Sequence, residues 1–451
     1  MATMSSNRRD RPPKMVKGGT VTLKKHRFES FTQRIVKLKI EPVRRARRQD
    51  VERDNLSSTT SFFKAGLASW GDLNLSENFT AFLHEVEPLC DSLAQILHYQ
   101  EKIMDILVEY IERRDVLSLE PLLSLMSHLA HDLGTRFEVH FSRVVVLITS
   151  LAAKHADVEV IEWSFACLAW LFKYLSRLLV PDLRPVYKIM APLLGKESQK
   201  IHITRFAAGA MSFLLRKAAL GHQKNAEPLT TIVQCILSDV EALGGQTVEL
   251  YRYGIMTLFA DAIKGIHRGL HSAGSTIYQC LLDQLTTPDM ITSSTCAKIV
   301  HGVTINLIHH TDAETFLPVL DVIHNDISRL SKTSKSLSIS VYGELLFIVA
   351  TVRKGSRIGD WKPVLDSLMS LFEQSTTDDE PVSAAYLQPV FEAAAVIFQY
   401  SSLDLIIPKF SSAITIIMNE SNRRSFIPFC VYFSDLGRDR FQSLLEPYFF
   451  R

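Results

Sequence analysis

The sequence is poor in cysteine and contains no long apolar run. Its six cysteines are at least 16 positions apart and form no CxxC pair, so neither a zinc knuckle nor a dense disulfide framework is expected. The longest stretch without Lys, Arg, Asp or Glu, Gly269 to Leu282, has only 14 residues, whereas a membrane-spanning helix needs roughly 20 apolar residues. Arg8 and Arg9 are followed by no apolar segment, which argues against a secretory signal. We therefore expect an intracellular protein with reduced thiols and no membrane association.

Glycine and proline are also scarce, with 19 and 17 residues among 451. Hydrophobic residues make up 47% of the chain and charged residues 22%. These values are typical of folded protein and exclude collagen-like and largely disordered chains. The length suits several globular domains or one long repeat array.

Motifs of catalytic sites are missing as well. We find no GxSxG sequence, no glycine-rich dinucleotide fingerprint and no kinase signature set. His128, His131 and Asp132 are spaced to share a helical face, but without further ligands nearby a structural histidine pair is the more common arrangement. Lys196 follows Gly195 as in a phosphate-binding loop, but the next residue is Glu and the upstream glycine is absent. We predict a protein that is not an enzyme and has no metal, cofactor or small-molecule substrate.

Charge is divided unevenly along the chain. Residues 1–54 contain 16 Lys or Arg and 6 Asp or Glu, whereas the remainder contains 34 and 42. A basic arm of this kind is typical of extensions that bind polyanions or a nuclear import receptor, and a solvated tail is a third interpretation. Our candidates for RNA or partner binding are Lys24, Lys25, Arg27, Arg34, Lys37, Lys39, Arg44, Arg45, Arg47 and Arg48.

Within this basic arm, residues 28–40 contain large apolar side chains. The positions fit a helix, although residues 35–40 also alternate as in a strand, so the sequence leaves the secondary structure open. Five apolar residues among bases cannot form a core of their own. We expect them to dock on the rest of the chain or on a partner: Phe28, Phe31, Ile35, Leu38 and Ile40.

After a connecting segment at 55–75, residues 76–451 have apolar residues at three- and four-residue steps, interrupted at regular intervals by helix breakers. Sixteen breakers from Asp115 to Gly437 define fifteen intervals of about 21.5 residues. Two intervals make about 43 residues, within the 40–47 residue period of HEAT and armadillo repeats. The prediction is an all-α fold, an α-solenoid of antiparallel helix pairs preceded by a basic, largely extended arm.

One stretch illustrates the expected helix boundaries. Ser118 is placed to cap a helix that Gly134 ends, and Thr135 is placed to cap the next one. Asp157 is then expected to open a helix from Val158 to Leu179. The helix after Thr135 has one continuous apolar stripe, formed by Phe137, Phe141, Val144, Ile148 and Leu151.

The predicted solenoid has one dense basic patch. If the helices around Pro181 and Gly195 fold back on each other, several of its side chains share one ridge and are able to contact phosphates. Solvated helix ends are the alternative interpretation. The patch consists of Arg177, Arg184, Lys188, Lys196, Lys200, Arg205, Arg216 and Lys217, of which the five from Arg184 to Arg205 are our weaker candidate site.

The run from Ile161 to Pro185, IEWSFACLAWLFKYLSRLLVPDLRP, closely resembles the N-terminal region of the "down-regulated in metastasis" family. Further matching runs lie in the same order along the chain, at 28–31, 37–45, 74–79, 114–123, 130–134 and 204–214. The matching residues are structural and include no active site.

The resemblance implies a HEAT-repeat, non-enzymatic scaffold of the nucleus and nucleolus. Family members are associated with the U3 small nucleolar ribonucleoprotein in the small-subunit processome, the 90S pre-ribosome, and act in the pre-rRNA processing that yields 18S rRNA. The implied partners are pre-rRNA, U3 small nucleolar RNA, other processome proteins and an import receptor. Family members are several times longer, and the apolar end at Tyr448, Phe449 and Phe450 leads us to expect a truncated solenoid.

An armadillo-type nuclear transport adaptor is the alternative function. Its cargo groove would need Trp and Asn at repeated helix positions. The only tryptophans, Trp70, Trp163, Trp170 and Trp361, follow no regular repeat, which disfavours this alternative. We expect Trp163 and Trp170 to belong to the core.

Overall fold

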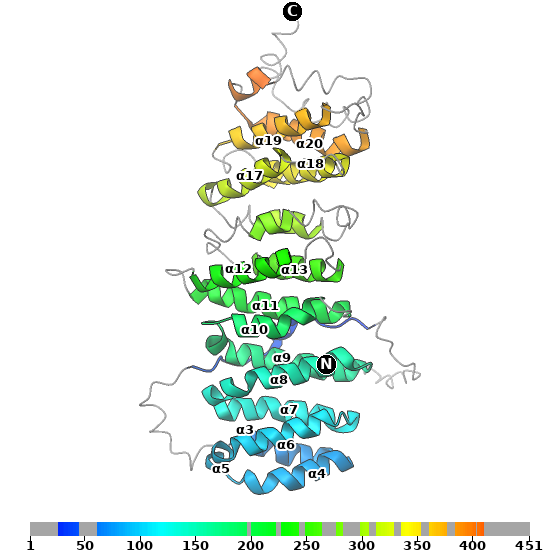
Figure 1. The fold of residues 1–451 in the computed structure, drawn as a ribbon, viewed down its shortest axis with the longest axis vertical. Helices are drawn as coiled ribbons and strands as arrows, with labels where there is room; N and C mark the ends of the chain where they lie inside the picture. Colours follow the sequence, from blue (N-terminus) through cyan, green and yellow to red (C-terminus); the bar gives the residue numbers. More distant parts are fainter. Residues whose placement is uncertain are drawn as a thin grey trace, which may run out of the picture.

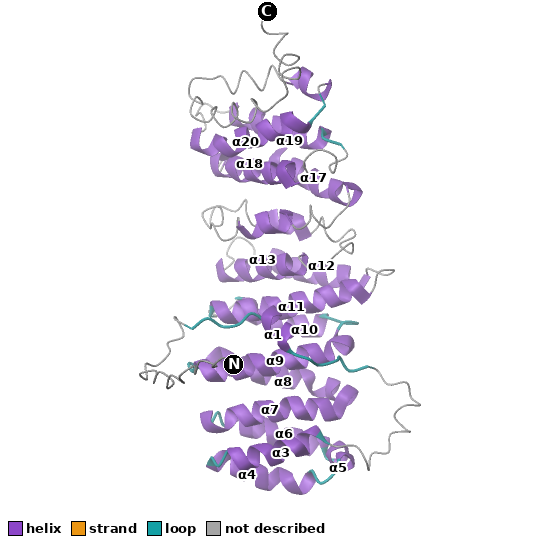
Figure 2. Cartoon of the chain, turned by 180° about the vertical axis from the view of Figure 1, so that it is seen from behind, coloured by secondary structure: helices purple, strands orange, loops and turns teal. Residues whose placement is uncertain are grey.

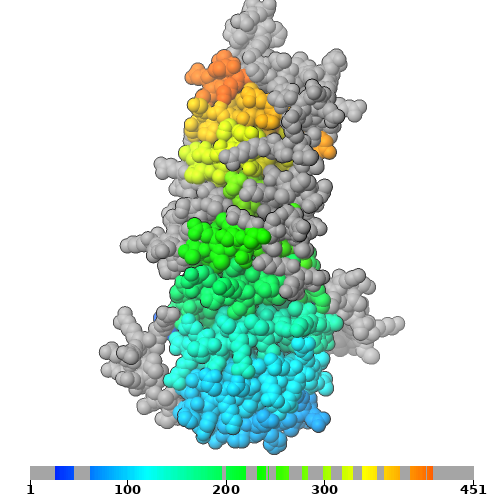
Figure 3. Space-filling model, in the orientation of Figure 1, coloured from blue at the N-terminus to red at the C-terminus, as the bar shows by residue number. Residues whose placement is uncertain are grey.

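The computed structural model describes residues 26–44, 61–195, 200–221, 227–242, 249–263, 277–282, 298–305, 313–328, 335–352, 360–376, 384–402 and 404–409. All regular elements within these ranges are helices. The helices lie across the long axis of the molecule, one layer above another, and form a tall column (Figure 1; Figure 3). The predicted all-α solenoid is confirmed.

The first part of the column runs from one end to the middle. Helix α1 covers Phe31–Lys37 and lies apart from its neighbours in sequence. The other helices of this part are layered from the lower end of the column, and the helix at 62–73 lies above the one at 77–86, beside the helix at 116–133 (Figure 1). They are α3 (Phe62–Leu73), α4 (Glu77–Val86), η1 (Glu87–Leu89), α5 (Leu93–His98), α6 (Gln100–Glu112), α7 (Val116–Leu133), η2 (Gly134–Phe137), α8 (Glu138–Lys154), α9 (Val158–Leu179), α10 (Arg184–Met190) and η3 (Ala191–Leu194).

The second part continues the stack to the other end. Helix α11 packs on α13, and α18 packs on both α19 and α20. The bounds are α11 (Ile201–Gly221), α12 (Glu227–Ala242), α13 (Glu249–Ile263), α17 (Ala313–Ser328), α18 (Lys335–Val352), α19 (Lys362–Thr376) and α20 (Ala384–Tyr400). Buried apolar side chains from Phe31 to Ile406 form one core cluster along the stack, as expected when each layer covers the next.

Two of the expected helix caps are wrong. Helix α7 begins at Val116 with Asp115 as its N-cap, and Ser118 is buried in the first turn, where its hydroxyl donates to the carbonyl oxygen of Asp115 at 3.0 Å. Thr135 caps nothing, because residues 134–137 form a 3-10 turn that leads directly into α8. Gly134 does end α7, with a positive φ of 56° that glycine adopts without strain.

The other expected boundaries in this stretch are confirmed. Helix α9 runs from Val158 to Leu179, and its N-cap residue Asp157 accepts a hydrogen bond from the backbone N–H of Glu159 at 2.9 Å.

The five side chains of the predicted apolar stripe from Phe137 to Leu151 are all buried. Trp163 and Trp170 are half-buried and pack against the core.

Helix α3 lies in the range 55–75 that was expected to be a connecting segment, and it packs against α7. The carboxylate of Asp132, on α7, caps its N-terminus from outside. It accepts from the hydroxyl of Ser61 at 2.6 Å and from the backbone N–H groups of Phe62 and Phe63 at 3.0 and 2.9 Å. These bonds satisfy donors that the first turn of a helix leaves free. Asp132 thus holds two helices together.

Within the ranges given above, none of the helices combines the length and the apolar character that a membrane crossing requires.

Candidate functional site

Residues 26–44, named here the docked segment, lie against the middle of the column. In Figure 2, α1 is seen beside α9, α10 and α11. Ser30 and Gln33 form a capping box at the start of α1, and the chain becomes extended at Leu38. The sequence fitted both a helix and a strand here; the structure has a helix at 31–37 followed by extended chain.

Phe31 anchors the docked segment in an aromatic pocket. Its ring centre lies 5.9 Å from that of Phe172 on α9, and 5.3 and 5.7 Å from those of Phe206 and Phe213 on α11. Phe31 is fully buried, as is most of Ile35, while Phe28, Leu38 and Ile40 are partly buried against the same core. All five apolar residues of the expected docking segment therefore contact the solenoid itself.

Polar contacts fix the docked segment along α9. The carboxylate of Glu162 pairs with the guanidinium of Arg34 and, at 2.8 Å, with the imidazole Nε2 of His26. Further along, the ammonium of Lys173 donates to the carbonyl oxygen of Ile35 at 3.0 Å, and to that of Leu38. These bonds satisfy one carbonyl group in the last turn of α1, which has no partner within the helix, and one in the extended chain that follows.

The ten basic candidates of the arm have different positions. The side chain of Arg34 is only 10% exposed and forms an ion pair with Glu162. It therefore binds a carboxylate of the same chain, whereas the sequence made it a candidate for binding RNA or a partner. Lys37 is exposed and pairs with Glu29. Arg27, Lys39 and Arg44 are exposed. The remaining five, Lys24, Lys25, Arg45, Arg47 and Arg48, lie outside the described residues.

The candidates of the weaker patch divide into two groups. Arg184 is exposed and forms a two-pronged pair with Asp182, at 3.0 and 3.1 Å, and Lys188 is exposed on the same helix, α10. Lys200 donates to the carbonyl oxygen of His155 at 2.9 Å. Arg205 is exposed on α11 and donates through Nε to the hydroxyl of Tyr253 at 2.7 Å. Lys196 lies outside the described residues.

An open groove joins the arm to this patch. One wall consists of residues 26–30 and Gln33 of the docked segment, and the other consists of residues 200–202, Arg205 and Phe206 around the start of α11. The groove, named here the arm groove, has a volume of about 870 Å³. Arg27, Lys200 and Arg205 line it together, whereas Arg184 and Lys188 are not part of its wall. Sequence reasoning missed this grouping, because it joins positions more than 170 residues apart.

The positive charge of the arm groove comes from its Arg and Lys side chains. Burial, followed by the charge of Lys200, lowers the pKa of His202 to about 4, so this imidazole is neutral at pH 7. Glu29 is the one carboxylate in the groove wall. A hydrogen bond from Lys37 lowers the pKa of Glu29, and the same lysine balances its charge.

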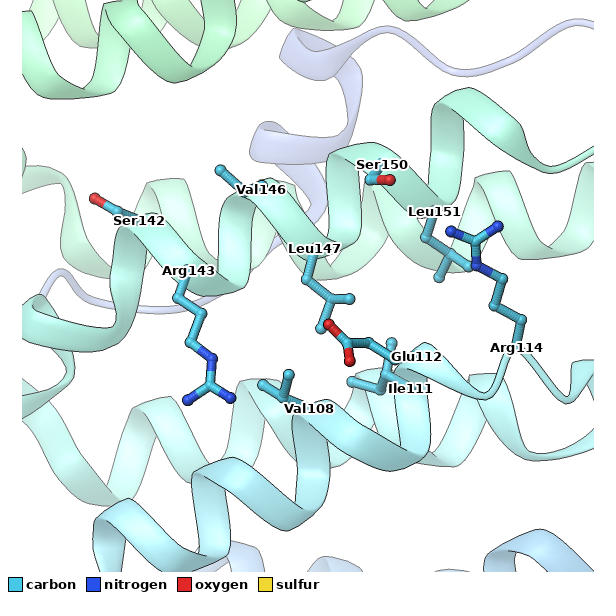
Figure 4. A pocket seen from close by; sticks show the side chains of 10 residues that line it. All are labelled: Val108, Ile111, Glu112, Arg114, Ser142, Arg143, Val146, Leu147, Ser150 and Leu151. Carbon is cyan, nitrogen blue, oxygen red and sulfur yellow. The ribbon is translucent and has the colours of Figure 1, made fainter.

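A second groove, of about 540 Å³, lies between α6 and α8 (Figure 4). Val108, Ile111, Leu147 and Leu151 contribute to its apolar wall. In Figure 4, Glu112 lies between Arg143 and Arg114. Arg143 pairs with Asp105 on α6.

The histidine pair considered from sequence has a structural role. His131 stacks on Tyr174, with ring centres 5.3 Å apart, and burial lowers the pKa of both His128 and His131. Asp132 is engaged at the cap of α3. Across the part of the chain that the structure describes, no three His, Cys, Asp or Glu side chains are grouped to hold a metal ion.

The chain is similar to two fungal proteins, both called U3 small nucleolar RNA-associated protein 20. It is 29% identical over 425 residues to the protein from Schizosaccharomyces pombe, covering 94% of this chain and 16% of the relative. It is 31% identical over 363 residues to the protein from Saccharomyces cerevisiae, covering 79% of this chain and 14% of the relative. The chain thus spans about one sixth of the length of these relatives. No family model matches it.

Proposed function

Because this chain belongs to the down-regulated-in-metastasis family, we propose that it is a non-catalytic scaffold of the small-subunit processome. In this role it contributes to the pre-rRNA processing that leads to 18S rRNA. Its partners would be pre-rRNA and other processome proteins, together with U3 small nucleolar RNA, which the names of both relatives contain. It would act in the nucleolus after import into the nucleus by a receptor.

The observation that carries this proposal is the similarity over 94% of the chain to a protein named for its association with U3 small nucleolar RNA. The structure supports it physically. A column of stacked helices offers a long, firm surface on which several partners are held at fixed distances. The exposed bases Arg27, Lys39 and Arg44 give the docked segment a surface suited to phosphates.

Co-purification tests the proposal. The 451-residue chain, tagged and expressed in cells of its source organism, is isolated from nuclear extract and sedimented through a density gradient. We expect 18S rRNA precursors and processome proteins in the tagged fractions, at the sedimentation position of large pre-ribosomal particles. Ribonuclease treatment of a parallel sample separates partners that are bound through RNA from those bound through protein.

Recovery with import carriers and diverse cargo, and without pre-rRNA, would contradict the scaffold and favour the transport adaptor. An RNA-cleaving or nucleotide-hydrolysing activity that co-elutes with the pure chain would contradict its non-catalytic role.

A further inference from the structure

We propose that the arm groove binds single-stranded RNA, with Arg27, Lys200 and Arg205 contacting its phosphates. This inference deepens the scaffold function proposed above and rests on it. Two parts of the chain form the site. Arg27 comes from the docked segment, Lys200 directly precedes α11, and Arg205 lies in α11. It exists only while the docked segment lies on the solenoid.

The three cations have the freedom that phosphate binding needs. Arg27 and Arg205 are exposed. The bond from Arg205 Nε to the Tyr253 hydroxyl uses one of five guanidinium N–H donors and fixes the direction in which the group points. Lys200 donates to the His155 carbonyl oxygen, and an ammonium has three donors. Lys200 and Arg205 are therefore positioned by the protein, and all three groups are still able to donate to a phosphate.

The remaining groups of the groove do not oppose an anion strongly. Glu29 is balanced by Lys37, and the second nearby carboxylate, Glu162, is balanced by Arg34 behind the docked segment. His202 is neutral at pH 7. The groove retains a net positive charge, which attracts a polyanion and makes its affinity depend on salt.

Aromatic rings in the groove favour RNA over an acidic peptide. Phe28 and His202 are stacked, with ring centres 4.3 Å apart, and both are half-buried in the groove wall. Arg205 also lies over the ring of Tyr253, at 5.7 Å from its centre. Alternating cations and planar side chains match the phosphates and bases of a single strand. A peptide of Asp and Glu would use the cations, but it has no planar group to pack on the parts of Phe28 and His202 that remain exposed.

The test is a binding titration with the intact chain. A fluorescein-labelled 12-nucleotide oligouridine is titrated with protein at several salt concentrations, and anisotropy gives the affinity. The double variant Arg27→Gln/Arg205→Gln is expected to bind roughly tenfold more weakly. Because two phosphate contacts are lost, the slope of log affinity against log salt should become shallower by about 1.4.

Two further variants distinguish binding in the arm groove from attraction by the overall positive charge of the chain. Lys102→Gln/Arg136→Gln removes two exposed cations elsewhere and should leave both affinity and slope near those of the original chain. Phe31→Asp keeps every Lys and Arg but removes the anchor of the docked segment. It should weaken binding as much as Arg27→Gln/Arg205→Gln, named here the groove variant. Circular dichroism confirms that each variant keeps its helices.

Equal binding by the groove variant and the original chain overturns this inference while leaving the scaffold function standing. An original chain that does not bind the oligouridine, or that binds a polyglutamate peptide more tightly, also overturns it. The scaffold function is judged separately by co-purification, so failure of the two is distinguishable.

Discussion

Phe31 and Gly209 touch in a way that tolerates no added atom. A Cβ built on Gly209 of α11 would lie 2.9 Å from the Cβ of Phe31. Real Cβ atoms almost never approach so closely, and the contact atom here is the stiff base of the side chain, not its flexible end. The glycine thus provides the space in which the docked segment reaches the core.

We predict that Gly209→Ala pushes α1 away from α11. Overpacking of this kind costs about 1–3 kcal/mol, which should appear as faster amide hydrogen exchange in residues 31–37 while the rest of the solenoid stays protected. Exchange is the right measurement because a repeat array need not unfold in one step.

The matched control is Gly302→Ala, also in a helix, where an added Cβ meets nothing within 4 Å. It should be neutral or stabilising by about 1 kcal/mol. Unchanged exchange of residues 31–37 in Gly209→Ala would contradict the tight contact.

Glu162 holds the docked segment through its ion pair with Arg34. We predict that replacing this carboxylate with a neutral side chain lowers the stability of the docked segment. Glu162→Gln leaves a nearly buried guanidinium without its carboxylate, and removing one partner of a buried pair costs several kcal/mol. Since Glu162 is itself 26% exposed, we expect about 2 kcal/mol. Limited proteolysis between residues 26 and 44 measures the loss.

The comparison variant is Glu29→Gln, which removes the partner of Lys37 in an exposed pair, with side chains 43% and 66% exposed. It should change the protection of the docked segment much less than Glu162→Gln does, because exposed pairs are screened by solvent. Similar effects of the two substitutions would show that burial does not distinguish these pairs.

Asp132 should matter more for α3 than an ordinary cap residue. Asp132→Ala removes the acceptor for Ser61, Phe62 and Phe63, and we predict that it destabilises α3 by about 2 kcal/mol. Hydrogen exchange over residues 62–73 reports the change. The control is Asp115→Ala, an N-cap residue whose side chain makes no capping hydrogen bond, so its effect should be several times smaller. If α3 stays equally protected in both variants, the capping role is wrong.

Acid should weaken the contact around His202. Its pKa is lowered from 6.5 to about 4 in the folded chain, chiefly by burial. As the pH falls, His202 is therefore protonated in the unfolded chain before it is protonated in the folded chain. The contribution of the neutral imidazole to the free energy of unfolding is complete above pH 6.5 and is lost as the pH falls from 6.5 to 4. Lys200 and His26 also disfavour the charged imidazole, and Glu162 favours it.

We expect His202→Phe, which keeps a ring against Phe28, to remove this part of the acid sensitivity. Because the imidazole is half-buried, the difference between the two proteins should be about 1–2 kcal/mol on going from pH 7 to pH 4. Urea denaturation at several pH values measures it. Parallel loss of stability in both proteins would exclude His202 as the group responsible.

Local patterns in the sequence were enough to predict much of the fold. The bounds of α9 and the buried stripe from Phe137 to Leu151 follow from apolar spacing and from the capping carboxylate of Asp157, which act within one or two helical turns. The caps predicted at Ser118 and Thr135 were wrong. Both residue types are common at helix N-caps, but a cap forms only where a helix begins, and the position of that start depends on the path of the chain and not on the residue type alone. Asp115, three residues before Ser118, occupies the N-cap position instead, without a capping hydrogen bond from its side chain.

The candidate site was less predictable. The apolar residues of the docked segment indicated that it must dock, but not where, since its pocket is built from Phe172, Phe206 and Phe213 far along the chain. For the same reason Arg34 could not be told from its exposed neighbours: only the fold brings Glu162 beside it. The arm groove likewise depends on the docking of one segment on another.

Ultraviolet crosslinking of the intact chain in living cells tests the central claim most directly. The joined nucleotides are identified by sequencing and the joined peptides by mass spectrometry. We expect crosslinks to precursors of 18S rRNA, concentrated in peptides from residues 26–44 and 200–205. Recovery of the chain without crosslinked pre-rRNA, or with crosslinks confined to other parts of the column, would contradict it.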